Sequence, residues 1–344
     1  MPPYRLALLG FGNVGQAFAR LLLRKKTELK DKYALNWKVT GIATGHHGIV
    51  IDQDGLDLEH YLRLAQTKPW LINPPTLNPP ITSSLDFIRH CHADVLFENT
   101  PVNYETGQPA VDHLKTALEL GMHTITANKG PVVHAYHQLK ELSTMQGKKF
   151  LFESTVMDGA PVFSLFRRAL PGAHLQAFSG ILNSTTNLIL TCMEEGHTFE
   201  EAVAYAQSIG IAESDPAGDI DGWDAAVKVA ALVTVLMDTP FKPQDVERQG
   251  IRYLSPQDVE QVRKQGKRWK LVCSAQKDGN QVKASVSTQK VGPDSPLYHV
   301  MGTSSMLQFQ TDVLGDLSII ENHPSPDTTA YGLLADFIYA VSVK

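Results

Sequence analysis

Residues 4–15, YRLALLGFGNVG, decide the fold of this chain. The run from Tyr4 to Leu9 has the composition of a buried strand, and Gly10-Phe11-Gly12-Asn13-Val14-Gly15 follows it directly as G-x-G-x-x-G. Apolar residues then recur with helical spacing as far as Leu22, so the glycines lie at a strand-to-helix turn. Such a turn brings backbone N–H groups to a pyrophosphate, and we expect residues 10–15 to bind a dinucleotide. The alternative is a glycine turn that binds nothing.

Strands and helices continue to alternate after this turn. Segments 93–98 and 123–127 read as strands, and the segment 108–120 between them reads as a helix. This alternation predicts a parallel sheet with helices on both faces, in which ligands bind beyond the carboxyl ends of the strands. Thr100, Asn128 and Lys129 follow two of these strands and are expected at the ligand site.

The end of the second strand bears on the choice of cofactor. This strand is expected at 37–43, and Thr44-Gly45-His46-His47-Gly48 follows it. An NAD-selective site carries an acidic residue near this point, and none occurs before Asp52. Without the acid a 2′-phosphate meets no repulsion, and Thr44, His46 or His47 is able to donate to it. The pattern favours NADP and leaves NAD open; the alternative for the histidines is an ordinary polar loop.

The pattern changes at about residue 154. Strands are expected at 174–182, 269–276 and 281–289, and the turn 183–187 begins another helix. Helices and strands in separate runs predict an α+β domain with a mixed sheet. We therefore expect an α/β protein with a dinucleotide-binding domain at 1–153, a catalytic domain at 154–310 and a C-terminal segment at 311–344.

An acidic loop leads into a lysine between Gly210 and Lys228. The loop carries five carboxylates: Glu213, Asp215, Asp219, Asp221 and Asp224. Asp224 and Lys228 are four residues apart on one helix face, and their neighbours are apolar on nearly every side. Charges at a buried helix start need partners or a function, and a buried lysine is suited to proton transfer. The loop predicts a site that holds an ammonium group and exchanges a proton on an oxygen; the alternative is a solvated ion pair.

Composition agrees with a soluble enzyme and adds little else. The 344 residues are 43% hydrophobic and 19% charged, enough for a full core in two domains. The net charge of −5 argues against nucleic acid or an anionic membrane as partner. The three cysteines, Cys91, Cys192 and Cys273, show no paired spacing and are expected to be reduced. With no signal peptide and no long apolar run, the chain is expected in the cytoplasm.

Four motifs in order resemble the homoserine dehydrogenase family. They are residues 10–15, Ala127-Asn128-Lys129-Gly130, residues 180–187 (GILNSTTN) and the stretch 210–228. Residues 329–336 (TAYGLLAD) resemble the closing helix of that family, so the likeness covers almost the whole chain. The resemblance implies interconversion of L-homoserine and L-aspartate 4-semialdehyde with NAD or NADP, on the way to threonine and methionine. It also implies that the C-terminal helix returns to the Rossmann domain and that the protein is a homodimer.

The resemblance assigns roles to single residues. Glu213 is expected to bind the substrate amino group, Asp224 to face its hydroxyl, and Lys228 to transfer the proton, with Asp219 in the same polar network. Lys129 is expected beside the nicotinamide and the substrate. Gly210 and Gly332 are implied to belong to the cofactor site.

The same resemblance implies a monovalent cation, Na⁺, held mainly by carbonyls of Glu153, Val156, Asp158 and Ala160. The family commonly has Val-Gly-Ala-Gly there, whereas this chain has Val156-Met157-Asp158-Gly159. The chain ends soon after the closing helix, and no appended regulatory domain is expected.

Two other classes of protein are considered. A phosphorylating semialdehyde dehydrogenase needs an activated cysteine, and no cysteine of this chain lies in an activating motif. A nucleotide-binding sensor without catalysis does not need both Lys129 and Lys228, which are retained.

Overall fold

The computed structural model describes residues 2–67, 81, 83–279 and 281–342. The chain divides into two compact units, and each is considered by itself. Unit 1 comprises Met1–Pro161 and Ser325–Lys344, and unit 2 comprises Val162–Pro324. The described residues contain no helix long and apolar enough to cross a membrane.

Unit 1 is built on a six-stranded sheet in the order β3-β2-β1-β4-β5-β6. The strands from β2 to β6 in this order run parallel, and β3 pairs antiparallel with β2 as an edge hairpin. The bounds are β1 Tyr4–Leu9, β2 Trp37–Thr44, β3 Gly48–Ile51, β4 Val95–Glu98, β5 His123–Thr126 and β6 Phe150–Leu151. The order changes direction between β1 and β4, and this topological switch point is where such sheets bind dinucleotides.

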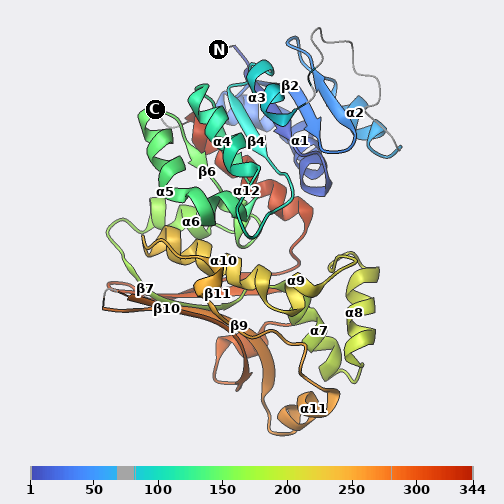
Figure 1. The fold of residues 1–344 in the computed structure, drawn as a ribbon, viewed down its shortest axis with the longest axis vertical. Helices are drawn as coiled ribbons and strands as arrows, with labels where there is room; N and C mark the ends of the chain where they lie inside the picture. Colours follow the sequence, from blue (N-terminus) through green and yellow to red (C-terminus); the bar gives the residue numbers. More distant parts are fainter. Residues whose placement is uncertain (1, 68–80, 82, 280, 343–344) are drawn as a thin grey trace. The chain divides into compact units, whose positions relative to one another are not determined.

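Helices cover both faces of this sheet (Figure 1). They are α1 Asn13–Tyr33, α2 Leu58–Leu64, α3 Ser84–His90, α4 Ala110–Glu119, α5 Lys129–Met145 and α12 Pro326–Ser342. Alternate residues of β1 explain the layers, because successive strand side chains point to opposite faces. Leu6 and Leu8 pack with α1 and α12, while Ala7 and Leu9 pack with residues of α3 and α4.

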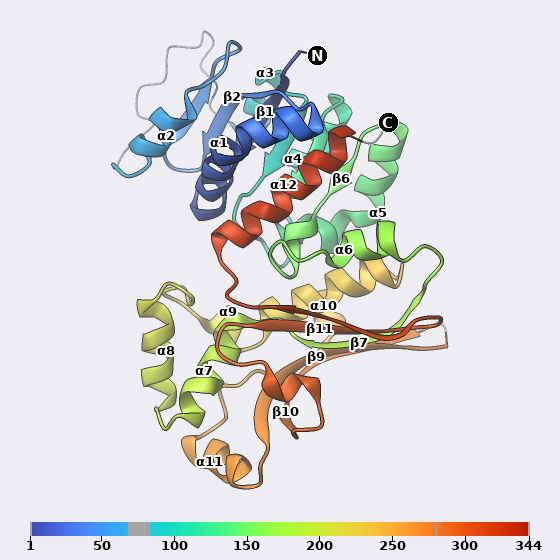
Figure 2. The same ribbon diagram turned by 180° about the vertical axis from the view of Figure 1, so that it is seen from behind.

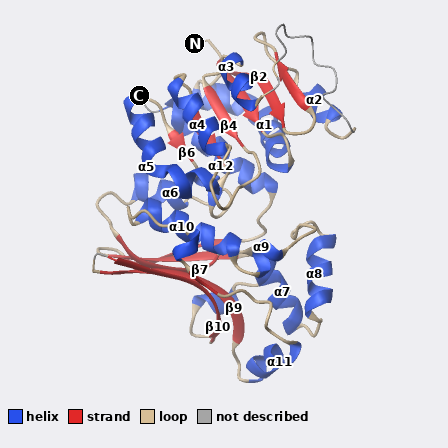
Figure 3. Ribbon diagram, viewed as in Figure 1, coloured by secondary structure: helices blue, strands red, loops and turns tan. Residues whose placement is uncertain are grey.

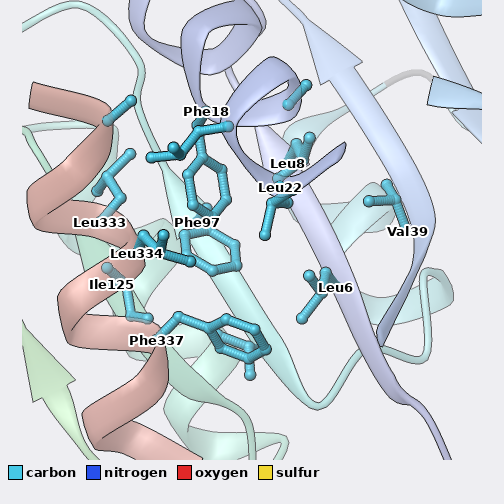
Figure 4. Packing of buried hydrophobic residues seen from close by; sticks show 14 of the residues in the cluster. Leu6, Leu8, Phe18, Leu22, Val39, Phe97, Ile125, Leu333, Leu334 and Phe337 are labelled. Atoms are coloured by element: carbon cyan, nitrogen blue, oxygen red, sulfur yellow. The ribbon is translucent and has the colours of Figure 1, made fainter. Parts of the chain in front are cut away.

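The C-terminal helix α12 completes the core of unit 1. Figure 2 shows it beside α1 on one face of the sheet. Its Phe337 packs edge-on against Phe97 of β4 with ring centroids 5.9 Å apart, and Phe97 contacts Phe18 of α1 (Figure 4). All three rings are fully buried, so α12 contributes to unit 1 as a core helix. The expected return of this helix to the dinucleotide-binding domain is confirmed.

Unit 2 contains a second six-stranded sheet, in the order β12-β11-β7-β9-β10-β8. Its strands are β7 Leu175–Ile181, β8 Glu247–Arg248, β9 Arg268–Asp278, β10 Gln281–Val291, β11 Ser305–Thr311 and β12 Gly315–Glu321. All neighbours are antiparallel except β10 and β8. Figure 3 distinguishes these strands from the helices α6 Val162–Ser164, α7 Ser184–Glu194, α8 Phe199–Ser208, α9 Ala217–Ile220, α10 Trp223–Leu236 and α11 Pro256–Lys264. The expected α/β class, with a Rossmann sheet and a mixed second sheet, is confirmed.

The boundaries between the two units differ from the domain boundaries expected from the sequence. We expected boundaries after residues 153 and 310, whereas the units divide after Pro161 and after Pro324. Residues 311–324 belong with unit 2 because β12 completes a hairpin with β11, which in turn pairs with β7. Residues 154–161 belong with unit 1, where the Ser154 hydroxyl donates to the Thr329 carbonyl at 2.8 Å.

Candidate functional site

The glycine turn after β1 has a shape that only glycine permits. Gly10 has a φ of +94°, and a Cβ there would lie 2.4 Å from the Asn99 carbonyl oxygen. A Cβ on Gly15 would lie 2.4 Å from the Gly10 carbonyl oxygen. At Gly12 a Cβ would meet no atom within 4 Å, so this glycine leaves open space at the start of α1. The turn is therefore tightly packed at Gly10 and Gly15 and open at Gly12.

The first turn of α1 is suited to a pyrophosphate. Gly12 is its N-cap residue, with no capping side chain and no acidic residue in the first turn. The positive end of the helix dipole, at Asn13 and Val14, therefore carries no competing carboxylate. Phe11 is buried and anchors the turn in the core. These features fit the phosphates of NAD or NADP.

Thr100 and Lys129 lie at the carboxyl ends of β4 and β5, as expected. Asn128 caps α5, since its Oδ1 accepts from the Gly130 N–H at 2.9 Å. Its Nδ2 donates to the Thr100 carbonyl at 3.0 Å. Asn128 therefore ties the loop that carries Thr100 to the helix that begins with Lys129.

β2 and β3 form an antiparallel hairpin. No second strand was expected there from the sequence. The Thr44 hydroxyl accepts from the His47 N–H at 2.8 Å and donates to the Gly48 carbonyl at 3.3 Å. Thr44 is thus committed to the turn, while the His46 side chain is exposed. Asp52 comes after β3 and is also exposed. Of the three expected donors, only His46 has an exposed side chain.

Gly332 and the expected cation segment belong to unit 1. A Cβ on Gly332 would lie 2.3 Å from the Ser154 hydroxyl oxygen, so the residue is required for the close packing of α12. Glu153 is buried, and its N–H donates to Asp336 at 2.8 Å. The described residues hold no cluster of three metal-binding side chains, and a cation here would depend on main-chain carbonyls such as those of Val156 and Ala160.

Asp158 stands where the family pattern has alanine, and it has its own structural role. Its φ is +40°, a left-handed conformation that aspartate tolerates better than most residues. One carboxylate oxygen accepts from the Ser325 N–H at 2.9 Å and from the Thr328 hydroxyl at 2.7 Å. Asp158 therefore holds the start of α12.

In unit 2, Lys228 and Asp224 form a shielded pair on α10. Lys228 Nζ lies 3.1 Å from Asp224 Oδ2, and their side chains are only 16% and 11% exposed. The amine also donates to the Leu182 carbonyl at 2.5 Å, just after β7. The alternative of a solvated ion pair is therefore wrong.

Asn183 joins two carboxylates beside this lysine. Its Nδ2 donates to Asp219 at 2.7 Å and to Asp224 at 3.0 Å, while its Oδ1 accepts from the Thr186 N–H and caps α7. Burial, reinforced by the charge of Asp224, raises the pKa of Asp219. The cluster thus holds a lysine, two carboxyl groups and an amide.

The remaining acids of the loop have other positions. Asp221 forms a bidentate pair with Arg252 at 2.8 and 3.0 Å, and Asp215 accepts from the Ala217 N–H at 3.1 Å. The Glu213 side chain is exposed, and its carbonyl accepts from Gln207. Gly210 has a φ of +75° directly after α8. In the described residues, Asp219 and Asp224 are the loop acids bonded to Asn183.

Asn183 and the Leu182 carbonyl were not predicted from the sequence as site residues. The available signal was position, because both lie where an expected strand ends and a helix begins. A capping asparagine with one amide group left over can serve a second element, here α9 and α10.

The cysteines show no sign of activation. All three are buried, and burial raises the pKa of Cys91 to about 11 and that of Cys273 to about 12. Burial also raises the pKa of Cys192. A thiol of this kind is a poor nucleophile at neutral pH. This argues against a mechanism with a catalytic cysteine.

Comparisons with known proteins agree along the chain. Residues 161–338 match the family model for homoserine dehydrogenase, and residues 10–153 match its NAD-binding domain. The homoserine dehydrogenase of Methanocaldococcus jannaschii is 36% identical over 97% of both chains. The chain belongs to the homoserine dehydrogenase family. The NAD(+)-dependent homoserine dehydrogenase of Pseudomonas canavaninivorans is 35% identical over 98% of this chain and 96% of its own.

Solved structures of the family have the same fold. A hyperthermophilic archaeal homoserine dehydrogenase in complex with NADPH has a TM-score of 0.82 and 27% identity, over 98% of both chains. The enzyme of Thiobacillus denitrificans has a TM-score of 0.81 and 25% identity, over 98% of this chain and 73% of its own. Members of this family are oxidoreductases that use NAD or NADP.

Proposed function

We propose that this protein interconverts L-homoserine and L-aspartate 4-semialdehyde, the step that leads towards threonine and methionine. The observation that carries the proposal is the shielded cluster of Lys228, Asp224, Asp219 and Asn183 in unit 2. Such a cluster supplies both charges that the substrate needs: carboxylates for an ammonium group and a lysine for an oxygen.

The carboxylates bind the polar ends of the substrate. Glu213 lies on the exposed loop and receives the amino group, where it forms a charge-assisted hydrogen bond. Asp224 orients the hydroxyl, because it already holds Lys228 at 3.1 Å. Asp219 shares the Asn183 amide with Asp224 and belongs to the same network.

Lys228 moves the proton. Oxidation of the primary alcohol removes a hydride from C4 and a proton from the hydroxyl, and reduction of the aldehyde returns both. Lys228 takes the proton in the first direction and gives it back in the second. As a cation it also stabilises negative charge that develops on the oxygen, and Lys129 shares this role.

Residues of unit 1 hold the cofactor. Gly10, Gly12 and Gly15 with the start of α1 receive the pyrophosphate, and Thr100 and Lys129 lie at the strand ends where the nicotinamide belongs. The family likeness also assigns Gly332 to the cofactor site; this residue packs α12 closely against Ser154 and Gly159. The nicotinamide, when bound, supplies the hydride acceptor or donor.

We propose that NADP is preferred over NAD. The support is the absence of an acidic residue at the end of β2 and the exposed imidazole of His46 in the hairpin that follows. The variant His46→Asp introduces the missing acid and is expected to lower the ratio of kcat/KM for NADP to that for NAD about tenfold or more, an effect equal to one lost charge contact. A wild-type ratio below unity would contradict the proposal.

We also propose that the protein is a homodimer and that Na⁺ binds at main-chain carbonyls of residues 153–160, as the family likeness implies. Light scattering of the purified protein is expected to give twice the mass of one chain. A thermal shift on replacing K⁺ by Na⁺ tests the ion.

The catalytic proposal is tested by following the absorbance of the reduced nicotinamide while protein, L-homoserine and NADP or NAD are mixed. Turnover that depends on homoserine is expected with at least one cofactor. Nucleotide binding without turnover would favour a sensor and contradict the enzyme.

A further inference from the structure

Glu98 is a fully buried carboxylate at the carboxyl end of β4. One of its oxygens accepts from the Thr100 N–H at 3.1 Å and from the Thr100 hydroxyl. The Thr126 hydroxyl, at the end of β5, is shared between the other carboxylate oxygen, at 3.0 Å, and the Glu98 main-chain carbonyl, at 2.8 Å. The carboxylate therefore bonds to both of the strand ends that carry the proposed nicotinamide residues.

The chain of bonds continues to Lys129. The Thr126 hydroxyl oxygen accepts from the Asn128 N–H at 2.9 Å, and Asn128 caps the helix whose first residue is Lys129. The Asn128 amide returns to the Thr100 carbonyl at 3.0 Å. Glu98, Thr126, Asn128 and Thr100 thus form a closed ring of hydrogen bonds.

The same ring supports the dinucleotide turn. A Cβ on Gly10 would lie 2.4 Å from the Asn99 oxygen and 3.1 Å from the Thr100 nitrogen, so the turn packs directly on the Asn99–Thr100 peptide. The Glu98 carboxylate holds that peptide by accepting a hydrogen bond from the Thr100 N–H. One carboxylate accordingly holds three loops of the proposed cofactor site.

The cost of burying this group makes a purely structural role a poor explanation. A carboxylate removed from water is costly even when paired, and apolar residues of similar volume often stabilise a core as well or better. The cost is reduced by three hydrogen bonds donated to the carboxylate. An apolar residue would not form the hydrogen bonds to Thr100 and Thr126 that fix the loops after β4 and β5.

We propose that Glu98 is a positioning residue for hydride transfer: it sets Thr100, Lys129 and the dinucleotide turn in one arrangement. The inference rests on the proposed function and extends it to a residue that touches neither substrate nor reacting atoms. Because Glu98 acts on unit 1, its loss affects the cofactor and the rate, whereas the homoserine residues Asp219 and Asp224 of unit 2 are unchanged.

The test compares two substitutions of Glu98 with a control at the other end of β4. Glu98→Ala removes the ring and is expected to lower kcat by about 10- to 100-fold and raise the KM of the cofactor about tenfold, with the KM of homoserine within about threefold of wild type. Glu98→Gln retains the ring, because its oxygen faces Thr100 and its amide donates to the Thr126 hydroxyl. It is expected to stay near wild type.

Asp94 is the matched control. It lies immediately before β4 and accepts from the Arg5 N–H at 2.9 Å and from its guanidinium at 2.8 and 3.2 Å. Asp94→Ala is expected to lower the melting temperature and leave both KM values and kcat unchanged. If Glu98→Ala behaves in this way, the proposal is wrong.

A second pair of variants decides the matter if Glu98→Ala does not fold. Thr126→Val keeps the shape and removes the hydroxyl, and is expected to show the same split between kcat and the two KM values. Thr126→Ser restores the hydroxyl and the kinetics. Wild-type kinetics in Thr126→Val, or a KM of homoserine that rises with that of the cofactor, would overturn the proposal.

Nucleotide titration separates this inference from the proposed function. If wild-type protein does not oxidise homoserine, the enzyme proposal fails, and fluorescence of bound NADPH still tests Glu98. Weaker binding in Thr126→Val and Glu98→Ala, restored in Thr126→Ser and Glu98→Gln, supports the positioning role. Equal binding in all of them contradicts it.

Discussion

Lys228 Nζ lies 3.1 Å from Asp224 Oδ2, one helical turn away on α10, and both side chains are largely shielded from solvent. The Lys264–Glu260 pair has the same spacing on α11, but its side chains are 72% and 64% exposed. An exposed pair of this kind contributes about 0.3–0.5 kcal/mol, whereas a shielded pair carries a desolvation cost that can exceed its attraction. Stability alone therefore does not account for Lys228 and Asp224, and this supports the catalytic role proposed for them.

Lys228→Ala is expected to lower kcat by about 10²- to 10⁴-fold, the range for a positioned acid or base, with little change in cofactor affinity. The residues proposed to bind the pyrophosphate and the nicotinamide lie in unit 1, so nucleotide titration is expected to give nearly the wild-type dissociation constant.

Lys228→Arg separates proton transfer from charge. Arginine keeps the positive charge but does not exchange a proton near neutral pH. If proton transfer is the role, Lys228→Arg is as slow as Lys228→Ala in steady-state assays. A variant that recovers most of the rate would identify Lys228 as an electrostatic group only.

Asn183 has two functions that substitution can separate. Asn183→Ala removes the cap of α7, worth about 0.5–2 kcal/mol, together with the amide that joins Asp219 and Asp224. Asn183→Ser keeps a capping hydroxyl and removes only the amide. We expect both variants to raise the KM of homoserine about tenfold, but only the alanine variant to lose stability in urea unfolding.

If the serine variant binds homoserine normally, the amide bridge does not organise the substrate site. A drop in stability as large as that of Asn183→Ala would show instead that the bridge, and not the cap, holds the loop.

Local sequence rules predicted the elements that carry the first unit. The strand expected at 4–9 has those bounds, and the strands expected at 37–43 and 123–127 are found at Trp37–Thr44 and His123–Thr126. These segments are mostly buried, lie inside the sheet and begin or end at clear turn residues. The shielded position of Asp224 and Lys228 was also predicted, because the residues around them leave α10 no polar face.

Non-local pairings were not predictable in the same way. β3 has only four residues and follows a turn of glycines and histidines, so its pairing with β2 leaves little local signal. The hairpin of β11 and β12 changed the domain boundary, because its place is set by pairing with β7 more than 120 residues earlier. The sequence likewise did not indicate a role for Glu98, because the residues around its carboxylate come from three separate segments of the chain.

Asp158→Ala is expected to lower the free energy of unfolding by about 1–3 kcal/mol. The substitution removes the acceptor for Ser325 and Thr328 and places alanine at a φ of +40°. Asp158→Asn keeps an acceptor oxygen and tolerates the left-handed conformation, so it is expected to stay near wild type in urea unfolding. An equal loss in both variants would mean that the charge at the start of α12, not the hydrogen bonds, provides the stability.

Lys270 predicts a pH dependence of stability. Its side chain is 1% exposed, and its amine donates to Asn187 Oδ1 at 2.9 Å and to the Val300 carbonyl. Burial lowers its pKa from 10.5 to about 8, against the opposing effect of Glu194. Between pH 8 and 10.5 the unfolded chain therefore binds more protons at this site than the folded chain. The destabilisation is complete below pH 8 and is relieved as the pH rises, by about 3 kcal/mol in all.

Lys270→Met isolates this contribution from the other groups that titrate at high pH. We expect the free energy of unfolding of wild type, minus that of the variant, to increase between pH 7.5 and 10 in urea titrations. The exposed Lys264→Met serves as control, and its difference from wild type is expected to stay nearly constant. A constant difference for Lys270→Met as well would mean that Lys270 keeps its proton throughout. In that case Glu194 stabilises the Lys270 ammonium more strongly than its position indicates. Burial raises the pKa of Glu194 itself, and Arg268, 3.4 Å away, opposes that shift.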